Sequence, residues 1–187
     1  GVAATQTMAA ERIAVGTGGA GGVFYAVGAG VADVINHELP GVSATAEVTG
    51  ASIENIRRVS AGQMQIGFSS ASTIYDAEHA KEVFEEPQSV AAIAYLYPAA
   101  LQLAVTEESG IDSIDDLKDA RVSLGPPGSN SSVIAQRLLE AYDAFNPGNV
   151  EFLSYSEATS AIKDNQLDAT FVLAGVPASA LISLSTS

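Results

Sequence analysis

Cysteine is absent from the 187 residues of this chain. Without cysteine the chain cannot form disulfides, bind zinc through thiolates, hold a cysteine-ligated iron–sulfur cluster or use a thiol as a nucleophile. This absence does not define the compartment, because a cysteine-free chain suits oxidising and reducing surroundings equally. The sequence also lacks a run of roughly 18 consecutive apolar residues, which a membrane-spanning helix would need.

Basic residues are few, with 8 Lys and Arg against 22 Asp and Glu, which gives a formal net charge of −14. Nucleic acids and anionic membranes are bound through clustered Lys and Arg, so the sequence predicts neither as a partner. Hydrophobic residues make up 47% of the chain, enough for a substantial core. Residues 1–11 contain neither a basic start nor a long apolar stretch, so we expect any signal peptide to have been removed.

The spacing of apolar residues switches repeatedly between a period of two and a helical period, which predicts alternating strands and helices. Such regular alternation predicts an α/β protein with parallel-rich sheets flanked by helices, in two units at 10–98 and 99–187. Gly28 and Gly30 cost about 1 kcal/mol each relative to Ala inside the helix expected at 22–39, so this helix is expected to pack closely against a neighbour. The strands are expected at 12–15, 43–48, 65–68, 90–94, 101–105, 121–124, 150–153 and 167–173. Further helices are expected at 52–62 with Ser52 as its N-cap, at 69–80 and 133–144, after caps at Ser113 and Ser156, and after 175–177.

The glycines at 16, 18 and 21 match the pattern G-x-G-x-x-G between a predicted strand and a predicted helix. This is the context of a dinucleotide-binding loop, so a Rossmann-type enzyme that uses the Gly16–Gly21 loop is one interpretation. Such a site expects an acidic residue at the end of the second strand, and Glu47 lies near that position. A tight turn against a helix start, with glycines for close backbone approach, explains the same residues.

Small and hydroxyl residues stand at five junctions where a predicted strand meets a predicted helix. Each helix start offers unpaired N–H donors and a partial positive charge, and the carboxyl ends of parallel strands lie at the edge where ligands bind. Helix starts from two lobes that face one crevice would therefore bind an anion without Lys or Arg, and none of these loops contains a basic residue. Ordinary helix capping explains the Ser and Thr residues equally well.

Two tyrosines near these junctions could cover a ligand and donate a hydroxyl hydrogen bond, or could simply pack in the core. The candidate ligand-binding residues are Gly18, Gly19, Gly21, Tyr25, Thr49, Ser69, Ser70, Tyr97, Pro127, Gly128, Ser129, Asn130, Ser131, Gly175, Val176 and Pro177.

Residues 67–71 (GFSSA) fall one residue short of the nucleophile elbow G-x-S-x-G of serine hydrolases. The two histidines are His37 and His79, so no histidine follows position 79, where the hydrolase order would need one. No H-x3-H or carboxylate pattern accompanies these histidines either. These residues therefore predict neither a serine hydrolase nor a metal site.

Six stretches together resemble the TAXI-type solute receptors of TRAP transporters. They are residues 16–25 (GTGGAGGVFY), 48–55 (VTGASIEN), 61–68 (AGQMQIGF), 96–98 (LYP), 122–129 (VSLGPPGS) and 173–177 (LAGVP). The matches follow one another in order from about residue 13 to the end, and this is far more specific than a single glycine loop. They favour the receptor over the dinucleotide enzyme.

The resemblance implies a two-lobed fold of the second periplasmic-binding-protein type, with a ligand cleft between the lobes. It implies an extracytoplasmic, non-catalytic receptor that delivers a small organic anion, such as a glutamate-like amino acid or a dicarboxylate, to the TRAP membrane permease. We expect a monomer that is exported to the periplasm, with a lipid anchor left open. The chain departs from the family in having Asn130-Ser131 where Gly-Thr is usual. Family members are also longer, and we expect the C-terminal segment that returns to the first lobe to be missing here.

Overall fold

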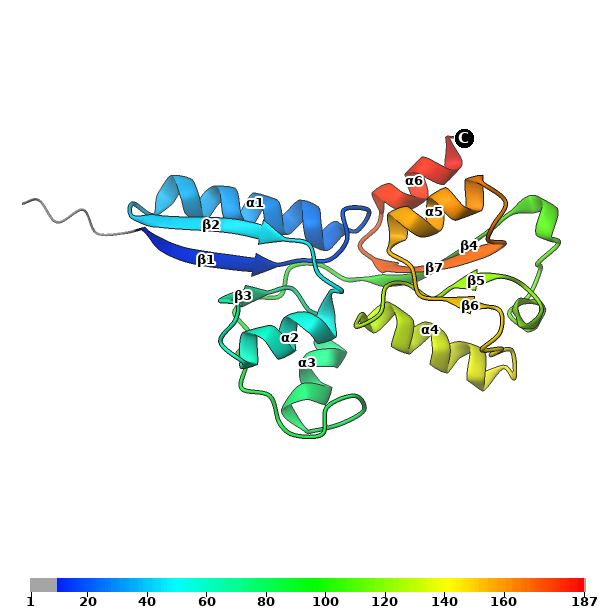
Figure 1. Cartoon of the computed structure of the whole chain (residues 1–187), viewed down its shortest axis with the longest axis horizontal. Helices are drawn as coiled ribbons and strands as arrows, with labels where there is room; N and C mark the ends of the chain where they lie inside the picture. Colours follow the sequence, from blue (N-terminus) through cyan, green and yellow to red (C-terminus); the bar gives the residue numbers. More distant parts are fainter. Residues whose placement is uncertain (1–9, 187) are drawn as a thin grey trace, which may run out of the picture.

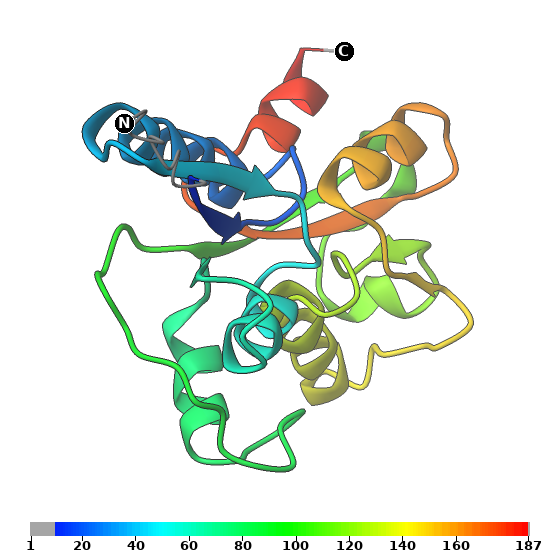
Figure 2. The same cartoon turned by 60° about the vertical axis from the view of Figure 1, so that its left-hand side comes forward.

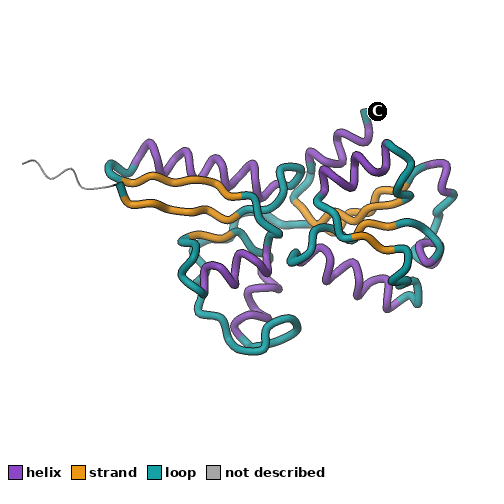
Figure 3. Tube along the Cα trace, viewed as in Figure 1, coloured by secondary structure: helices purple, strands orange, loops and turns teal. Residues whose placement is uncertain are grey.

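The computed structural model describes residues 10–186, which form two α/β halves, each built on its own sheet (Figure 1). The N-terminal half contains a parallel sheet in the order β2-β1-β3. Helix α1 lies on one side of this sheet, and α2 and α3 lie on the other (Figure 3). The elements are β1 (Glu11–Gly16), α1 (Val23–Glu38), β2 (Val42–Glu47), α2 (Ser52–Ser60), β3 (Ile66–Gly67) and α3 (Ala71–Glu78).

Helix α1 packs the apolar stripe that its spacing predicts. Phe24, Val27, Val31 and Ile35 pack against a cluster that includes Val15. The expected close approach is confirmed at Gly28, where an added Cβ would lie 2.4 Å from Thr17 Cγ2. At Gly30 nothing lies within 4 Å of an added Cβ, so packing does not require a glycine at this position.

The C-terminal half contains a four-stranded sheet in the order β4-β7-β5-β6, with α5 and α6 on one side and α4 on the other (Figure 1). Leu117, Val122, Leu124, Leu139 and Phe171 form its core, each at most 2% exposed. The elements are β4 (Ala100–Val105), the 3-10 turns η1 (Glu107–Ser109) and η2 (Asp115–Lys118), β5 (Val122–Ser123), α4 (Asn130–Ala141), β6 (Val150–Glu151), α5 (Tyr155–Lys163), β7 (Ala169–Ala174) and α6 (Ser179–Ser185).

Strand β4 departs from the parallel arrangement. It runs antiparallel to β7, with Ala100 opposite Ala174 and Val105 opposite Ala169, whereas β5 is parallel to both of its neighbours. β4 enters its sheet directly from the segment that joins the two halves, and no crossover helix returns it to a parallel direction. The sheets are therefore parallel-rich, as the sequence predicts, but not purely parallel.

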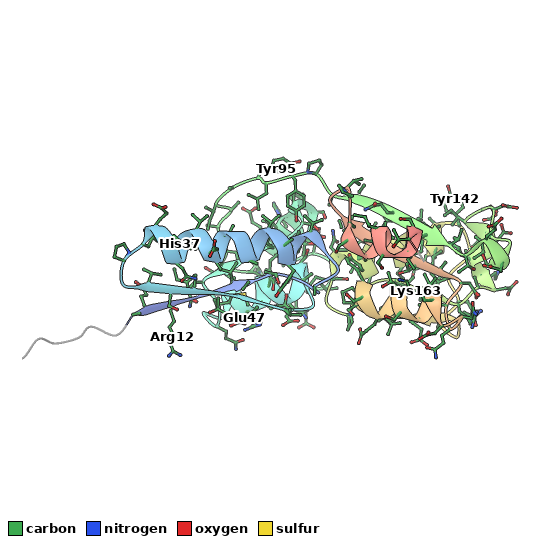
Figure 4. The ribbon with its side chains drawn as sticks, turned by 90° about the horizontal axis from the view of Figure 1, so that it is seen from above. Arg12, His37, Glu47, Tyr95, Tyr142 and Lys163 are labelled. Carbon is green, nitrogen blue, oxygen red and sulfur yellow. The ribbon has the colours of Figure 1, made fainter. Side chains whose placement is uncertain are left out.

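The prediction of a strand at 90–94 is wrong. This stretch makes no strand pairing with any described residue, and Ile93 and Tyr95 are 82% and 77% exposed. The segment runs as extended chain along the outside of the molecule (Figure 2), and the Tyr95 side chain stands clear of α1 in Figure 4. An apolar run becomes a buried strand only where a neighbouring strand pairs with it, and within residues 10–186 no strand pairs with this stretch.

Three predicted helix caps are also wrong. Ser52 lies inside α2, and the residue that precedes this helix is Ala51, with φ +75°. The cap of α5 is Ser154 rather than Ser156, because Ser154 and Glu157 form a reciprocal capping box. Ser113 precedes a 3-10 turn and donates to the Asp116 carboxylate, which accepts its hydroxyl at 2.7 Å and its N–H at 2.8 Å.

Within residues 10–186, no helix has the length and apolar character needed to cross a lipid bilayer.

Candidate binding cleft

The two halves meet through loops that follow strand ends. On one side the carbonyl of Gly21 accepts hydrogen bonds from Ala180 N at 3.3 Å and Ser179 Oγ at 3.1 Å. On the other side the carbonyl of Gly128 accepts from Ile53 N at 3.0 Å and Glu54 N at 3.3 Å, at the start of α2. A cavity of about 30 Å³ remains between these two contacts.

The cavity is lined by loop and helix-start residues from both halves. No Asp, Glu, Lys or Arg occurs among the described residues that line it, although the chain carries a net charge of −14. Backbone N–H groups and hydroxyls are therefore the polar groups that it can offer. The lining residues are Gly18, Gly19, Gly22, Val23, Phe24, Ala51, Ser52, Ser70, Ala99, Pro126, Ser129, Asn130, Ser131, Tyr155, Leu173 and Ala174.

Asn55, on α2, forms hydrogen bonds with the loops that follow all three strands of the first sheet. It is fully buried, and its Nδ2 donates to the carbonyls of Thr17 at 2.7 Å and Phe68 at 2.8 Å. Its Oδ1 accepts from Thr49 Oγ1 at 2.7 Å. The Thr49 hydroxyl also accepts from Ala51 N at 3.0 Å, so it supports the loop before α2 and does not line the cavity. Asn55 thus positions the N-terminal wall of the cleft.

The start of α4 forms the C-terminal wall. Ser129 is the N-cap of this helix, because its Oγ accepts from Ser132 N at 3.2 Å and donates to the Pro126 carbonyl at 2.6 Å. Ser129 is therefore a structural cap as well as a cavity residue. Asn130 Nδ2 reaches across to the N-terminal half and donates to Ser72 Oγ at 3.0 Å.

Ser131 differs from its neighbours because its buried hydroxyl makes no well-formed hydrogen bond with any described residue. The residue is 1% exposed and lines the cavity. It lies close to the Tyr155 hydroxyl, which donates to the Leu173 carbonyl at 3.0 Å and accepts from Leu173 N at 3.1 Å. Burial raises the pKa of Tyr155, against smaller opposite effects of Ser131 and the Leu173 backbone. Ser131 therefore presents to the cavity a hydroxyl that has no well-formed hydrogen-bond partner within residues 10–186.

Tyr97 lies at the crossing between the halves. Its ring packs against Gly175, where an added Cβ would lie 3.1 Å from Cδ2, and near Phe24, at 6.5 Å between ring centroids. The hydroxyl is buried without a hydrogen-bond partner among residues 10–186, and burial raises the pKa of Tyr97 to about 12. Tyr97 lines a second, larger hollow of about 710 Å³ beside the open edge of β3. Asn130 and Ser70 border both hollows, which are therefore adjoining.

The structure brings together only part of the predicted set. Six predicted residues line the small cavity, namely Gly18, Gly19, Ser70, Ser129, Asn130 and Ser131. Two others, Ser69 and Tyr97, line the adjoining hollow. Those that line neither are Gly21, Tyr25, Thr49, Pro127, Gly128, Gly175, Val176 and Pro177.

Several of this second group have structural roles. An added Cβ at Gly21 would meet Ser156 Oγ at 2.9 Å, so this glycine allows the first loop to approach α5. Val176 is 73% exposed on the outside of the molecule. Asn55 and Tyr155 were not predicted, because nothing in their local sequence distinguishes them from helix residues of ordinary role.

Two α/β halves that meet across a cleft of strand ends and helix starts define the second type of periplasmic-binding-protein fold. The chain belongs to the NMT1-like family, which it matches over residues 15–187.

Solved structures share this fold at low sequence identity. The alkanesulfonate-binding protein SsuA from Xanthomonas axonopodis pv. citri, solved with MOPS, is 19% identical with a TM-score of 0.55, over 88% of this chain and 56% of its own. The periplasmic aliphatic sulphonate binding protein SsuA from Escherichia coli is 18% identical with a TM-score of 0.52, over 95% and 58%. A protein from Bordetella bronchiseptica RB50 is 18% identical with a TM-score of 0.64, over 97% and 55%. The present chain thus spans little more than half the length of these proteins.

Proposed function

We propose that the chain belongs to an extracytoplasmic receptor that captures a small organic anion between its two halves and delivers it to a membrane permease. The observation that carries the proposal is the cavity where strand ends and helix starts of both halves converge without any charged side chain. Helix starts supply N–H donors and a partial positive charge, which suit a carboxylate or sulfonate. Ser131 adds a buried hydroxyl that lies close to the Tyr155 hydroxyl and makes no well-formed hydrogen bond within residues 10–186.

The finer assignment rests on the motif resemblance. We propose a TAXI-type receptor of a TRAP transporter, monomeric and exported to the periplasm, with a glutamate-like amino acid or a dicarboxylate as its ligand. Gly18, Gly19, Ser70, Ser129, Asn130 and Ser131 would surround the anionic group. The predicted residues that line neither hollow, Gly21 and Gly128 among them, would act through loop shape.

An aliphatic sulfonate is the second candidate ligand. It is favoured by the names of two fold relatives, which describe alkanesulfonate and aliphatic sulphonate binding. A sulfonate presents three acceptor oxygens to the same kind of donor set. The permease would then be of another type, while the receptor role would be unchanged.

Ligand-dependent thermal unfolding tests the proposal. The panel contains L-glutamate, succinate and ethanesulfonate, with NAD and putrescine as controls of other chemistry. A ligand at 100 times its dissociation constant adds about 2.7 kcal/mol to the free energy of unfolding, which corresponds to a rise in Tm of roughly 5–10 °C for a chain of this size. A shift with NAD and none with any carboxylate or sulfonate would favour the dinucleotide enzyme instead.

A further inference from the structure

Two adjoining hollows of different size meet at the cleft. The small cavity has a volume of about 30 Å³ and the larger hollow about 710 Å³. A water molecule needs about 10–15 Å³ of cavity volume, so the small cavity has room for about two water-sized groups, such as the two oxygens of a carboxylate. The larger hollow falls within the range of about 300–1,000 Å³ that is usual for small-molecule sites. Both are bordered by Phe24, Ser70, Ala99, Asn130 and Leu173.

The small cavity is suited to one anionic group. The starts of α1 and α3 have no side-chain cap, and their N-cap residues Gly22 and Ser70 line the cavity. The start of α2 already donates to the Gly128 carbonyl, and the start of α4 is capped by Ser129. Unused N–H donors therefore remain at α1 and α3. The buried, unpartnered hydroxyl of Ser131 borders the same space and adds a donor that does not depend on a helix start.

The larger hollow offers hydrocarbon and no charge. No Asp, Glu, Lys or Arg occurs among the described residues that line it, and Phe68, Ile74 and Ile134 bring apolar side chains to it from both halves. Asn55 also lines it, but its amide already bonds within the protein. The Tyr97 hydroxyl is the lining polar atom that is buried without a partner within residues 10–186. One neutral hydroxyl does not compensate the desolvation of a charged group.

The extended segment 90–99 forms one wall of the larger hollow, and all ten of its residues line it. This is the stretch that runs along the outside of the molecule in Figure 2. No charged residue occurs between Glu86 and Glu107, although the chain contains 22 Asp and Glu. Residues 91–96 are exposed and apolar, and exposed apolar patches of this kind mark binding sites. The apolar run that is typical of a buried strand thus has another use as a hydrocarbon wall.

We propose that the ligand is an amphiphilic monoanion, with one carboxylate or sulfonate in the small cavity and an uncharged, largely hydrocarbon body in the larger hollow. The inference rests on the proposed function, and it differs from the motif-based assignment in what the ligand carries beyond its anionic group. A dicarboxylate or a glutamate-like amino acid would bring a second charge against side chains that offer no opposite charge. A hydrocarbon body instead gains roughly fourfold in affinity for each methylene that it buries.

A matched ligand series tests the inference by calorimetric titration of the full chain. Butanoate, hexanoate and octanoate differ only in the body, and suberate has the length of octanoate with a second carboxylate at its far end. Succinate and L-glutamate represent the motif-based assignment. The carboxylate series is repeated with the corresponding alkanesulfonates, all below the concentrations at which they form micelles. We expect the dissociation constant to fall roughly fourfold per methylene up to octanoate, and suberate to bind at least about tenfold more weakly than octanoate.

Ile134→Asn alters the larger hollow, and Ile182→Asn is its matched control. Ile134 borders the larger hollow but not the small cavity, whereas Ile182, on α6, is 49% exposed and borders neither. Ile134→Asn should weaken octanoate about tenfold and butanoate less than about twofold, because a polar amide then faces the hydrocarbon body. Ile182→Asn should change neither dissociation constant. Ser131→Ala should weaken all members of the series by the same factor, because they share the anionic group.

The other outcomes separate this inference from the proposed function. A series with no dependence on length, or tighter binding of succinate or L-glutamate than of octanoate, would overturn the amphiphilic ligand and leave the proposed function supported. Octanoate binding that Ile134→Asn leaves unchanged, or that Ile182→Asn weakens equally, would place the body outside the larger hollow and overturn the inference too. Binding of none of these carboxylates and sulfonates would refute the proposed function, and this inference with it.

Discussion

Ser131→Ala separates a ligand-binding hydroxyl from a structural one more cleanly than any other change at the cleft. The Ser131 hydroxyl is buried and makes no well-formed hydrogen bond within residues 10–186, and the Tyr155 hydroxyl beside it keeps its own bonds to Leu173 when Ser131 is replaced. An unsatisfied buried polar group costs about 1–3 kcal/mol, so the free energy of unfolding without ligand should stay the same or rise by up to about 1 kcal/mol. If the hydroxyl donates to an anion, affinity should fall roughly tenfold or more, since a hydrogen bond to a charged group contributes about 1.5–3 kcal/mol.

Ser129→Ala is the matched comparison, two residues away on the same helix start. Its hydroxyl accepts from Ser132 N and donates to the Pro126 carbonyl, so its loss removes an N-cap. The free energy of unfolding should fall by about 1 kcal/mol, which lowers Tm by roughly 2–4 °C in a chain of this size. A loss of affinity in Ser129→Ala could therefore come from the lost contact with the ligand or from the weakened helix start. In Ser131→Ala the helix cap is intact, so a loss of affinity reports the contact with the ligand.

Urea unfolding and calorimetric titration with the anion that stabilises the protein give the two quantities for each variant. The reasoning would be refuted if Ser131→Ala lowered the free energy of unfolding by 1 kcal/mol or more, a threshold set by the usual worth of one hydrogen bond. It would equally fail if Ser131→Ala left the dissociation constant unchanged for every carboxylate and sulfonate in the panel.

Three further predictions follow from individual contacts. Asn55→Ala should lower the free energy of unfolding by about 3 kcal/mol in urea, because two buried carbonyls lose their donor; a loss below about 1 kcal/mol would contradict its role. Gly18→Val should leave Tm almost unchanged but weaken anion binding more than tenfold in titration, since its Cβ would lie 3.3 Å from Ala51 Cβ at the cavity; unfolding of the variant would instead make this glycine structural. Hydrogen bonds from Arg121 lower the pKa of Asp168 in the folded protein. The stability that the Asp168 carboxylate contributes is therefore present above the unfolded pKa of about 3.9 and is lost as pH falls through the lower folded pKa. Asp168→Asn should therefore flatten the acid limb of a stability–pH profile, and an unaltered limb would count against the pairing.

Helix α1 was predictable because its signals are local. Phe24, Val27 and Val31 recur at helical spacing, and Pro40-Gly41 ends the pattern, so the predicted range 22–39 differs from Val23–Glu38 by one residue at each end. The cap of α5 was also within reach, since Ser154 and Glu157 have the spacing of a capping box. The prediction of Ser156 overlooked that pattern.

The parts that failed depend on distant partners. An apolar stretch at 90–94 is typical of a buried strand, but strand formation needs a neighbour with free backbone groups, and sequence cannot locate one. The candidate site also depends in part on distant partners. The loops that line the cavity were predictable from their small residues. Asn55 and the buried Tyr155, by contrast, acquire their roles from carbonyls that lie 13 or more residues away in the chain.

The acidic composition and the proposed anionic ligand are compatible because of how the carboxylates near the cleft are used. Glu54 on α2 accepts from Gly50 N at 2.6 Å and lies 3.6 Å from Arg58, and Glu157 on α5 accepts from Ser154. Both carboxylates are thus turned toward their own loops, and neither lines the cavity. At about 10 Å the repulsion from the remaining surface charge is largely screened at 0.1 M salt, while hydrogen bonds from helix starts act at contact distance in a site shielded from water. Attraction inside the cleft can therefore outweigh a net charge of −14.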